Sequence, residues 1–183
     1  MKGTQTNLKD CWLIEPDIFE DDRGFFFEGF NAEKFKTLTG TNFVPRQLNQ
    51  SGSIKGVLRG LHFQNSPKPQ AKLVSCTQGE LLDVAVDLRR DSPTFKKCCT
   101  VRLSEENKKQ LFIPRGFAHG FIVLSEYAKL MYQVDEVYSP QHDSGIAYND
   151  PELNISWVLP ESEIILSNKD QNLKPLAETE FNF

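Results

Sequence analysis

The chain has 183 residues, of which 39% are hydrophobic and 25% charged, and its formal net charge is −4. This composition is typical of a soluble globular protein and predicts a single domain spanning residues 1–183. The acidic balance, with no long basic run, argues against non-specific nucleic-acid binding. An anionic small substrate remains compatible with it, because such a ligand needs only a few local cations.

Targeting signals and metal motifs are not apparent. The first ten residues are polar and do not predict a signal peptide, and no run of 18 apolar residues predicts a membrane span. The four cysteines form no C-x-x-C motif, so we expect reduced thiols in a cytoplasmic protein. They are Cys11, Cys76, Cys98 and Cys99.

In chain order, the sequence indicates short strands separated by turns, beginning with an aromatic run at residues 25–30 after a turn at 21–24. The clearest helix follows at residues 32–38, with Asn31 as its N-cap and Gly40 just beyond its end. Residues 104–107 resemble a single helical turn. Further strands are predicted at residues 57–63, 72–77, 82–88, 110–113, 118–123 and 128–134.

The strand at residues 82–88 alternates apolar side chains at even positions with Asp83, Ala85 and Asp87 at odd ones. This is the pattern of a half-buried strand, with one face in the core and the other in water. Many short strands at regular spacing, with few helices, predict an all-β sandwich or barrel.

The segment around His62 combines strand alternation with glycine and polar residues. Alternation places Gly60, His62 and Gln64 on one face. Arg59 would point away from that face, unless a bulge at Gly60 turns it. A lone histidine is usually structural, but a polar face with glycine beside it favours close approach of a ligand.

A metal site is not supported by the histidine spacing. His119 follows a Pro-x-Gly-x-x-His turn of the kind found in cupin barrels, whose metal-binding members typically use a His-x-His pair. Here the corresponding pair is His62 and Gln64, and His142 sits beside Pro140 in a predicted loop. An open three-ligand site would need carboxylates that no spacing supplies, so we expect no metal.

Without a metal, acid–base chemistry falls to side chains. Histidine changes charge near neutral pH, so His62 can act as a general base. Its ring would need a carboxylate partner, and spacing alone leaves both Asp83 and Asp170 open. Tyr132 alternates with apolar neighbours and can project inward, although a lone strand tyrosine more often packs in a core.

These motifs resemble those of the dTDP-4-dehydrorhamnose 3,5-epimerases, the metal-free cupin-like epimerases of deoxysugar synthesis. The similarity runs nearly end to end and implies a jelly-roll β-barrel with a few short helices. The matching motifs are Asp22-Arg23-Gly24-Phe25-Phe26-Phe27-Glu28, Gln47-x-Asn49-x-Ser51, residues 56–64, 69–74 and 113–121, Asp87-Leu88-Arg89 with Ser92-Pro93-Thr94, Tyr138-Ser139-Pro140, Asn149-Asp150-Pro151 and Lys169-Asp170.

The resemblance also implies residue roles. His62 matches the general base, Asp170 its orienting carboxylate and Tyr132 the general acid, while Lys72 matches a lysine near the C4 oxygen of the sugar. The chain departs from the family at the nucleotide end, where Asp143 replaces a usual glutamate and Ser144 a common arginine. Positions matching substrate-binding residues are Arg23, Glu28, Gln47, Asn49, Arg59, His119, Tyr138, Asp143 and Lys169.

The implied reaction converts dTDP-4-dehydro-6-deoxy-D-glucose to dTDP-4-dehydro-L-rhamnose by inverting C3 and C5. A ketone at C4 acidifies both neighbouring C–H bonds, and a cation near its oxygen stabilises the enolate charge that develops. The resemblance implies no cofactor, a homodimer and a cytoplasmic location.

Three alternatives remain open on the sequence alone. An epimerase acting at only C3 or only C5, or on another nucleotide, would share the motifs. A non-catalytic cupin that binds a sugar nucleotide would tolerate loss of the base or the acid. The presence of both His62 and Tyr132 therefore counts against this alternative. A metal-dependent cupin oxygenase is disfavoured by the ligand count.

Overall fold

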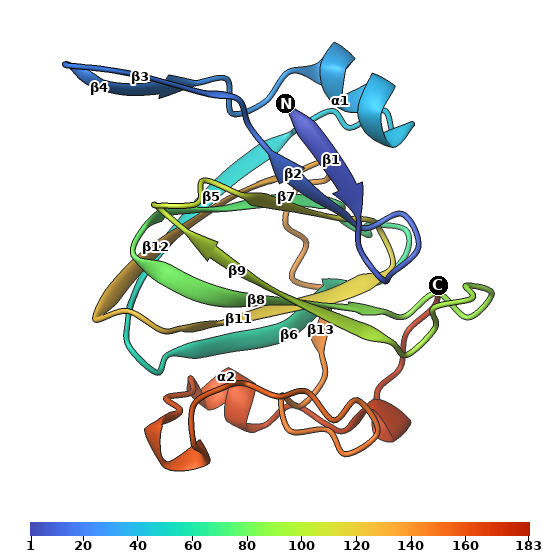
Figure 1. Cartoon of the computed structure of the whole chain (residues 1–183). Coiled ribbons are helices and arrows are strands. Elements are labelled where there is room, and N and C mark those ends of the chain that lie inside the picture. Colours follow the sequence, from blue (N-terminus) through green and yellow to red (C-terminus); the bar gives the residue numbers. More distant parts are fainter.

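Thirteen β-strands in antiparallel sheets dominate the computed structural model, which describes all residues from Met1 to Phe183. Two sheets face each other and form a jelly-roll barrel, so the all-β prediction is confirmed (Figure 1). The six-stranded sheet has the order β1 (Lys2–Gln5), β2 (Trp12–Glu15), β10 (Gln110–Ile113), β7 (Lys72–Gln78), β12 (Tyr127–Val134) and β5 (Gln47–Ile54).

The second sheet has five strands and provides the opposite wall of the barrel. Its order is β13 (Asp143–Gly145), β6 (Leu58–Gln64), β11 (Phe117–Val123), β8 (Glu80–Asp87) and β9 (Cys98–Ser104). A separate hairpin, β3 (Ile18–Asp21) and β4 (Gly24–Phe27), projects from the barrel beside helix α1 (Ala32–Thr39).

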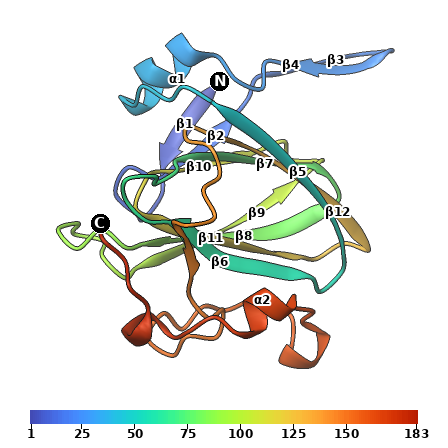
Figure 2. The same ribbon diagram turned by 180° about the vertical axis from the view of Figure 1, so that it is seen from behind.

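Three apolar clusters hold these layers together. One cluster of 15 buried residues, including Val74 and Phe121, fills the space between the sheets. A second cluster, including Trp157, covers the outer face of the five-stranded sheet with residues 146–183, which Figure 2 shows along that side of the barrel. This segment contains helix α2 (Asn168–Gln171) and the short 3-10 helices η1 (Glu161–Glu163) and η2 (Leu176–Glu178).

The third cluster lies under α1, where the helix prediction is confirmed. Asn31 accepts hydrogen bonds from two backbone N–H groups of the first turn, and Gly40 ends the helix with a φ of 73°. Phe35 is the buried residue of the helix, and its ring centroid lies 4.9 Å from that of Phe112 on β10. This contact joins α1 to the six-stranded sheet.

The predicted strands are present, with small differences at their ends, and residues 110–113 form β10 as predicted. The aromatic strand ends at Phe27, before Phe30, whose ring centroid lies 5.7 Å from that of Phe35 on α1. The helical turn predicted at residues 104–107 is wrong. There, Ser104 and Asn107 exchange side-chain and backbone hydrogen bonds in a turn instead.

Strand β8 departs most from its predicted environment, since both of its faces are buried. Its apolar face is covered by residues 146–183, and its polar face points into the barrel, where Asp83 and Asp87 are fully buried. The Asp87 carboxylate accepts hydrogen bonds from Arg89, Ser92 and Thr94. The Asp-Leu-Arg motif therefore stabilises a corner of the barrel.

Membrane-spanning helices are missing from the structure, since no helix has the length and apolar character to cross a bilayer.

Candidate active site

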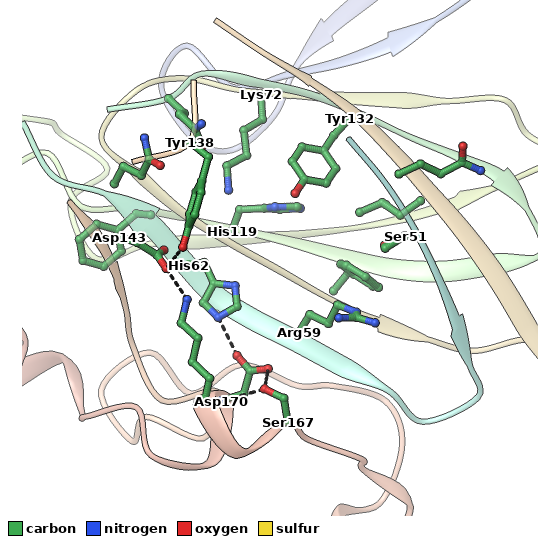
Figure 3. A pocket seen from close by; sticks show the side chains of 17 residues that line it. Ser51, Arg59, His62, Lys72, His119, Tyr132, Tyr138, Asp143, Ser167 and Asp170 are labelled. Atoms are coloured by element: carbon green, nitrogen blue, oxygen red, sulfur yellow. Dashed lines mark hydrogen bonds and ion pairs between the residues drawn. The ribbon is translucent and has the colours of Figure 1, made fainter. Parts of the chain in front are cut away.

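A cavity of about 330 Å³ opens between the two sheets. It is lined from both sides of the barrel and by the segments that follow β12 and precede α2 (Figure 3). Its lining residues are Gln50, Ser51, Arg59, His62, Phe63, Gln64, Gln70, Lys72, His119, Phe121, Leu130, Tyr132, Tyr138, Asp143, Ser167, Lys169 and Asp170.

A bulge in β6 turns Arg59 and His62 toward the same cavity. Opposite β6, His119 pairs with His62 and Phe121 pairs with Arg59, so β6 carries one extra residue between these pairs. Gly60 lies in this interval with a φ of 124°, and a Cβ there would lie 2.5 Å from the Cα of Gly120. The bulge at Gly60, which the sequence left open as the exception that would turn Arg59, is present.

His62 lies against the carboxylate of Asp170. Nε2 of His62 is 2.6 Å from Oδ1 of Asp170, and neither buried atom has another partner. The contact is close enough for a hydrogen bond, but it is not aligned as a linear one. The His62 side chain is 28% exposed and that of Asp170 only 4%, so the ring reaches the cavity while the carboxylate lies behind it.

The first turn of α2 places the Asp170 carboxylate. Ser167 caps the helix by accepting from the Asp170 N–H, and its hydroxyl donates to Oδ2 of Asp170 at 2.6 Å. Burial opposes the charge of this carboxylate, but the adjacent His62 ring and the hydrogen bond from Ser167 outweigh it, so the pKa of Asp170 is lowered. Asp170 is therefore an anion that can hold the His62 ring.

Lys72 and Tyr132 enter the cavity from the other sheet, on β7 and β12 (Figure 3). Burial lowers the pKa of Lys72 to about 8, and its neighbours act on its ammonium through charge alone, without a hydrogen bond. Burial also raises the pKa of Tyr132, so its phenol remains protonated at neutral pH. The cavity thus presents the Lys72 ammonium as an unpaired cation and the Tyr132 phenol as a proton donor, both opposite the His62 ring.

A second histidine–carboxylate pair lies beside the first. His119 is the direct partner of His62 across β6 and β11, and its Nε2 lies 2.8 Å from Oδ1 of Asp83. Burial is the main cause that lowers the pKa of His119. Of the two carboxylates that spacing left open for His62, Asp170 therefore lies at His62 and Asp83 at His119.

Tyr138, Asp143 and Lys169 meet at the rim of the cavity (Figure 3). The Tyr138 hydroxyl donates to Oδ2 of Asp143 at 3.1 Å, and Nζ of Lys169 lies 2.5 Å from the same oxygen. Asp143, the departure from the family pattern, therefore joins the other two side chains through one carboxylate oxygen.

Four of the predicted substrate-binding residues do not line this cavity. Gln47 and Asn49 lie on β5 near it and bond to each other, Nε2 to Oδ1, at 2.8 Å. Arg23 lies at the β3–β4 hairpin with its side chain 90% exposed, and Glu28 pairs with Lys34 on the surface. Neither the Arg23 guanidinium nor the Glu28 carboxylate lines the cavity of its own chain.

Sequence reasoning did not single out several residues that the structure places at the site. Ser167, which holds Asp170, is marked only by the Ser-x-x-Asp spacing of a helix N-cap. Ser53 accepts a hydrogen bond from the guanidinium of Arg59 at 3.1 Å. It lies on the same face of β5 as Asn49 and Ser51, and this alternation could have identified it. No three histidine, cysteine, aspartate or glutamate side chains come together in a way that could hold a metal ion.

The barrel and its cavity define a class of protein, namely a jelly-roll enzyme equipped for proton transfer. A base backed by a carboxylate lies on one sheet, and a phenol and an unpaired ammonium lie on the other. This set can remove a proton next to a carbonyl, stabilise the resulting oxyanion and return a proton from another direction.

Comparison with known proteins narrows the class. The family model described as dTDP-4-dehydrorhamnose 3,5-epimerase matches residues 5–178. The chain is 49% identical to the dTDP-4-dehydrorhamnose 3,5-epimerase of Pseudomonas aeruginosa, over 98% of both chains. The chain therefore belongs to the dTDP-4-dehydrorhamnose 3,5-epimerase family.

Two solved structures agree with this assignment. The crystal structure of dTDP-4-dehydrorhamnose 3,5-epimerase from Elizabethkingia anophelis is 51% identical, with a TM-score of 0.96 over 99% of both chains. A dTDP-6-deoxy-D-glucose-3,5-epimerase from Legionella pneumophila, solved with dTDP-4-keto-L-rhamnose, is 46% identical, with a TM-score of 0.94. That match covers 98% of this chain and 94% of the other.

Proposed function

We propose that this chain, as one catalytic domain, inverts C3 and C5 of dTDP-4-dehydro-6-deoxy-D-glucose to give dTDP-4-dehydro-L-rhamnose, a step of dTDP-rhamnose synthesis. The family membership supports the reaction, and the relative solved with dTDP-4-keto-L-rhamnose supports the ligand class. The observation that carries the proposal is the placement of His62 and Tyr132 on opposite sheets around one cavity that also holds Lys72.

In this mechanism His62 removes the proton at C3 or C5 and Asp170 stabilises the imidazolium that forms. The electrons move onto the C4 oxygen, where the Lys72 ammonium stabilises the enolate. Tyr132 then delivers a proton to the carbon from the opposite side of the ring, which inverts the centre. Exchange with solvent removes the proton from His62 and reprotonates Tyr132 before the second centre reacts. Because the electrons return to the carbon on reprotonation, no redox cofactor takes part.

The proposal is tested by incubating the protein with dTDP-4-dehydro-6-deoxy-D-glucose in D₂O and following both positions by NMR. Deuterium and inversion at C3 and C5 are expected, with activity retained after chelation. Label at one centre alone would assign a single-centre epimerase. Tight binding without exchange would assign a binding protein, and loss of activity on chelation would assign a metal enzyme.

The rate should fall as pH rises through about 8, because burial lowers the pKa of Lys72 to that value. Above this pH the ammonium loses its proton and no longer stabilises the enolate. We expect a pH–rate profile whose alkaline limb lies near pH 8 in the wild type. In Lys72→Arg the limb should disappear, because a guanidinium stays charged up to about pH 12. A limb that persists in this variant would assign it to another group.

The remaining substrate contacts support a homodimer. Arg23 and Glu28 match substrate-binding positions, yet both lie outside the cavity of their own chain. The hairpin that carries Arg23 also exposes three phenylalanines, and exposed apolar patches of this kind mark interfaces. In the proposed dimer, the hairpin of one copy extends to the cavity of the other. The exposed rings are Phe19, Phe25 and Phe26.

A hollow with a mixed polar and apolar lining, which includes Glu20, Glu105 and Lys108, lies under the hairpin. This hollow of about 710 Å³ separates the hairpin from the outer face of the six-stranded sheet, between Phe27 on one side and Met131 on the other. Lys108 lies 3.9 Å from the ring centroid of Phe25 and helps to hold the hairpin in place.

Phe26→Glu is expected to give a monomer whose activity is lower by about tenfold or more, since it loses charged contacts from the partner. Phe26 is 68% exposed, so the substitution should leave the fold of each chain intact. Light scattering and turnover measure the two effects. Val158→Glu, at an exposed position on the opposite side of the barrel, is the control. A fully active monomer would show that the cavity is complete within one chain.

The free thiols support the proposed cytoplasmic location. All four cysteines are free, as expected in a reducing compartment. Three of these thiols are buried, so the test is to denature the protein directly from a cell extract and count the thiols that a thiol reagent modifies. Four reactive thiols are expected, and disulfides would argue for an oxidising location.

A further inference from the structure

Asp83 is a fully buried carboxylate beside the cavity residue His119, and the mechanism above does not use it. Its side chain is 0% exposed on β8, and Oδ1 lies 2.8 Å from Nε2 of His119. The other oxygen, Oδ2, is buried with no hydrogen-bond partner. A carboxylate held out of water in this way is costly unless charges or dipoles around it compensate.

His119 has its two ring nitrogens in different environments. Nε2 faces the carboxylate of Asp83, whereas Nδ1 has no hydrogen-bond partner in the protein, and the ring lines the cavity. A carboxylate only accepts hydrogen bonds, so its partner nitrogen must carry the hydrogen. Burial lowers the pKa of His119, and the charge of Lys72 acts in the same direction. The ring is therefore neutral near pH 7, and Nδ1 has a free lone pair.

We propose that Asp83 is a positioning residue that fixes His119 in the Nε2–H tautomer, so that Nδ1 accepts a hydrogen bond from the substrate. The donor is a hydroxyl group, which the proposed sugar substrate provides. This inference rests on the proposed function for the identity of that donor, but the tautomer itself does not depend on it. His119 then recognises the substrate as an acceptor, whereas the neighbouring Lys72 and Arg59 are donors.

The charge of Asp83 also acts on Lys72 across the barrel. Burial disfavours the Lys72 ammonium, and Asp83 is the strongest of the neighbours that oppose this effect. Asp143 acts in the same direction as Asp83, and Lys169 opposes them. Loss of the Asp83 charge should therefore make the ammonium of Lys72 easier to deprotonate.

The tautomer can be measured directly on the unmodified protein by ¹⁵N NMR of its histidine rings. The chain has only three histidines, so spectra of His119→Gln and His142→Gln assign the signals. We expect a hydrogen on Nε2 of His119 and a bare Nδ1 from pH 6 to 8. A hydrogen on Nδ1, or on both nitrogens, would overturn the proposal. This result is independent of epimerisation, because no substrate is present.

Asp83→Asn provides the functional test. The variant keeps the shape of the side chain and removes its charge. We expect a mixture of His119 tautomers, a KM higher by about tenfold and an alkaline limb of the rate profile at lower pH. Glu80→Gln, which removes an exposed carboxylate from the same strand, should change none of these. If Asp83→Asn folds and shows the wild-type tautomer, KM and pH profile, Asp83 has only a structural role.

Discussion

His62→Asn is expected to lower the rate of deuterium exchange at both C3 and C5 by about 10²–10⁴, the usual contribution of a general base. One base serves both centres in the proposed mechanism, because His62 is the cavity histidine whose ring is held by the Asp170 carboxylate at 2.6 Å. Asparagine removes the base and retains a polar side chain of similar reach. The measurement is incubation with the keto sugar in D₂O.

His142→Asn is the matched control. His142 bonds to Ser139 through Nδ1 and does not line the cavity, so its replacement should leave exchange unchanged. Asp170→Asn should act in the same direction as His62→Asn, because the amide cannot stabilise the imidazolium by charge. Near wild-type exchange in His62→Asn would assign the base to another group.

Tyr132→Phe is expected to separate proton removal from inversion. The phenylalanine ring fills the same space but cannot deliver a proton, while His62 and Lys72 remain to form the enolate. Deuterium should therefore enter from the base side at carbons that keep their original configuration. Net epimerised product should fall by about 10²–10⁴, with little change in melting temperature. NMR read for both label and stereochemistry gives the two rates.

Tyr127→Phe, on the same strand β12 and outside the cavity, is the control for loss of a phenol. It should retain both exchange and inversion. Normal inversion in Tyr132→Phe would mean that water or another side chain is the acid. Tyr132 would then be a packing residue, consistent with its contact with the core between the sheets.

Local patterns predicted seven of the thirteen strands, and β1, β2, β3, β5, β9 and β13 were not predicted. Alternation located the strands that carry His62, His119 and Tyr132, and the Asn31 cap with Gly40 located α1. Glycine was informative at position 60, where only a residue without a side chain permits the close approach to Gly120.

The environment of β8 could not be predicted from its alternation. The pattern of Asp83, Ala85 and Asp87 indicated a face in water, but this face lies inside the barrel. Alternation separates two faces without showing what covers each. The apolar face of β8 is covered by residues 146–183, which have little regular structure and so gave no periodic signal.

Residue spacing also could not predict which distant segments contact each other. Nothing in the order of residues assigns Asp170 to His62 and Asp83 to His119; that choice depends on how α2 and β8 lie against the barrel. The contacts of Arg23 on the β3–β4 hairpin could not be predicted either. In the proposed dimer they are made with the cavity of a second copy of the chain.

The placement of Asp170 makes the competence of the base depend on a segment outside the barrel. Residues 146–183 dock on the outer face of the five-stranded sheet, and α2 within them carries the carboxylate to His62. Local opening of such a peripheral segment requires less free energy than global unfolding. A transient detachment would therefore leave the barrel folded but its base without a counter-ion. Hydrogen exchange of the α2 amides and loss of turnover under mild denaturant should then follow the same transition, before the strands unfold.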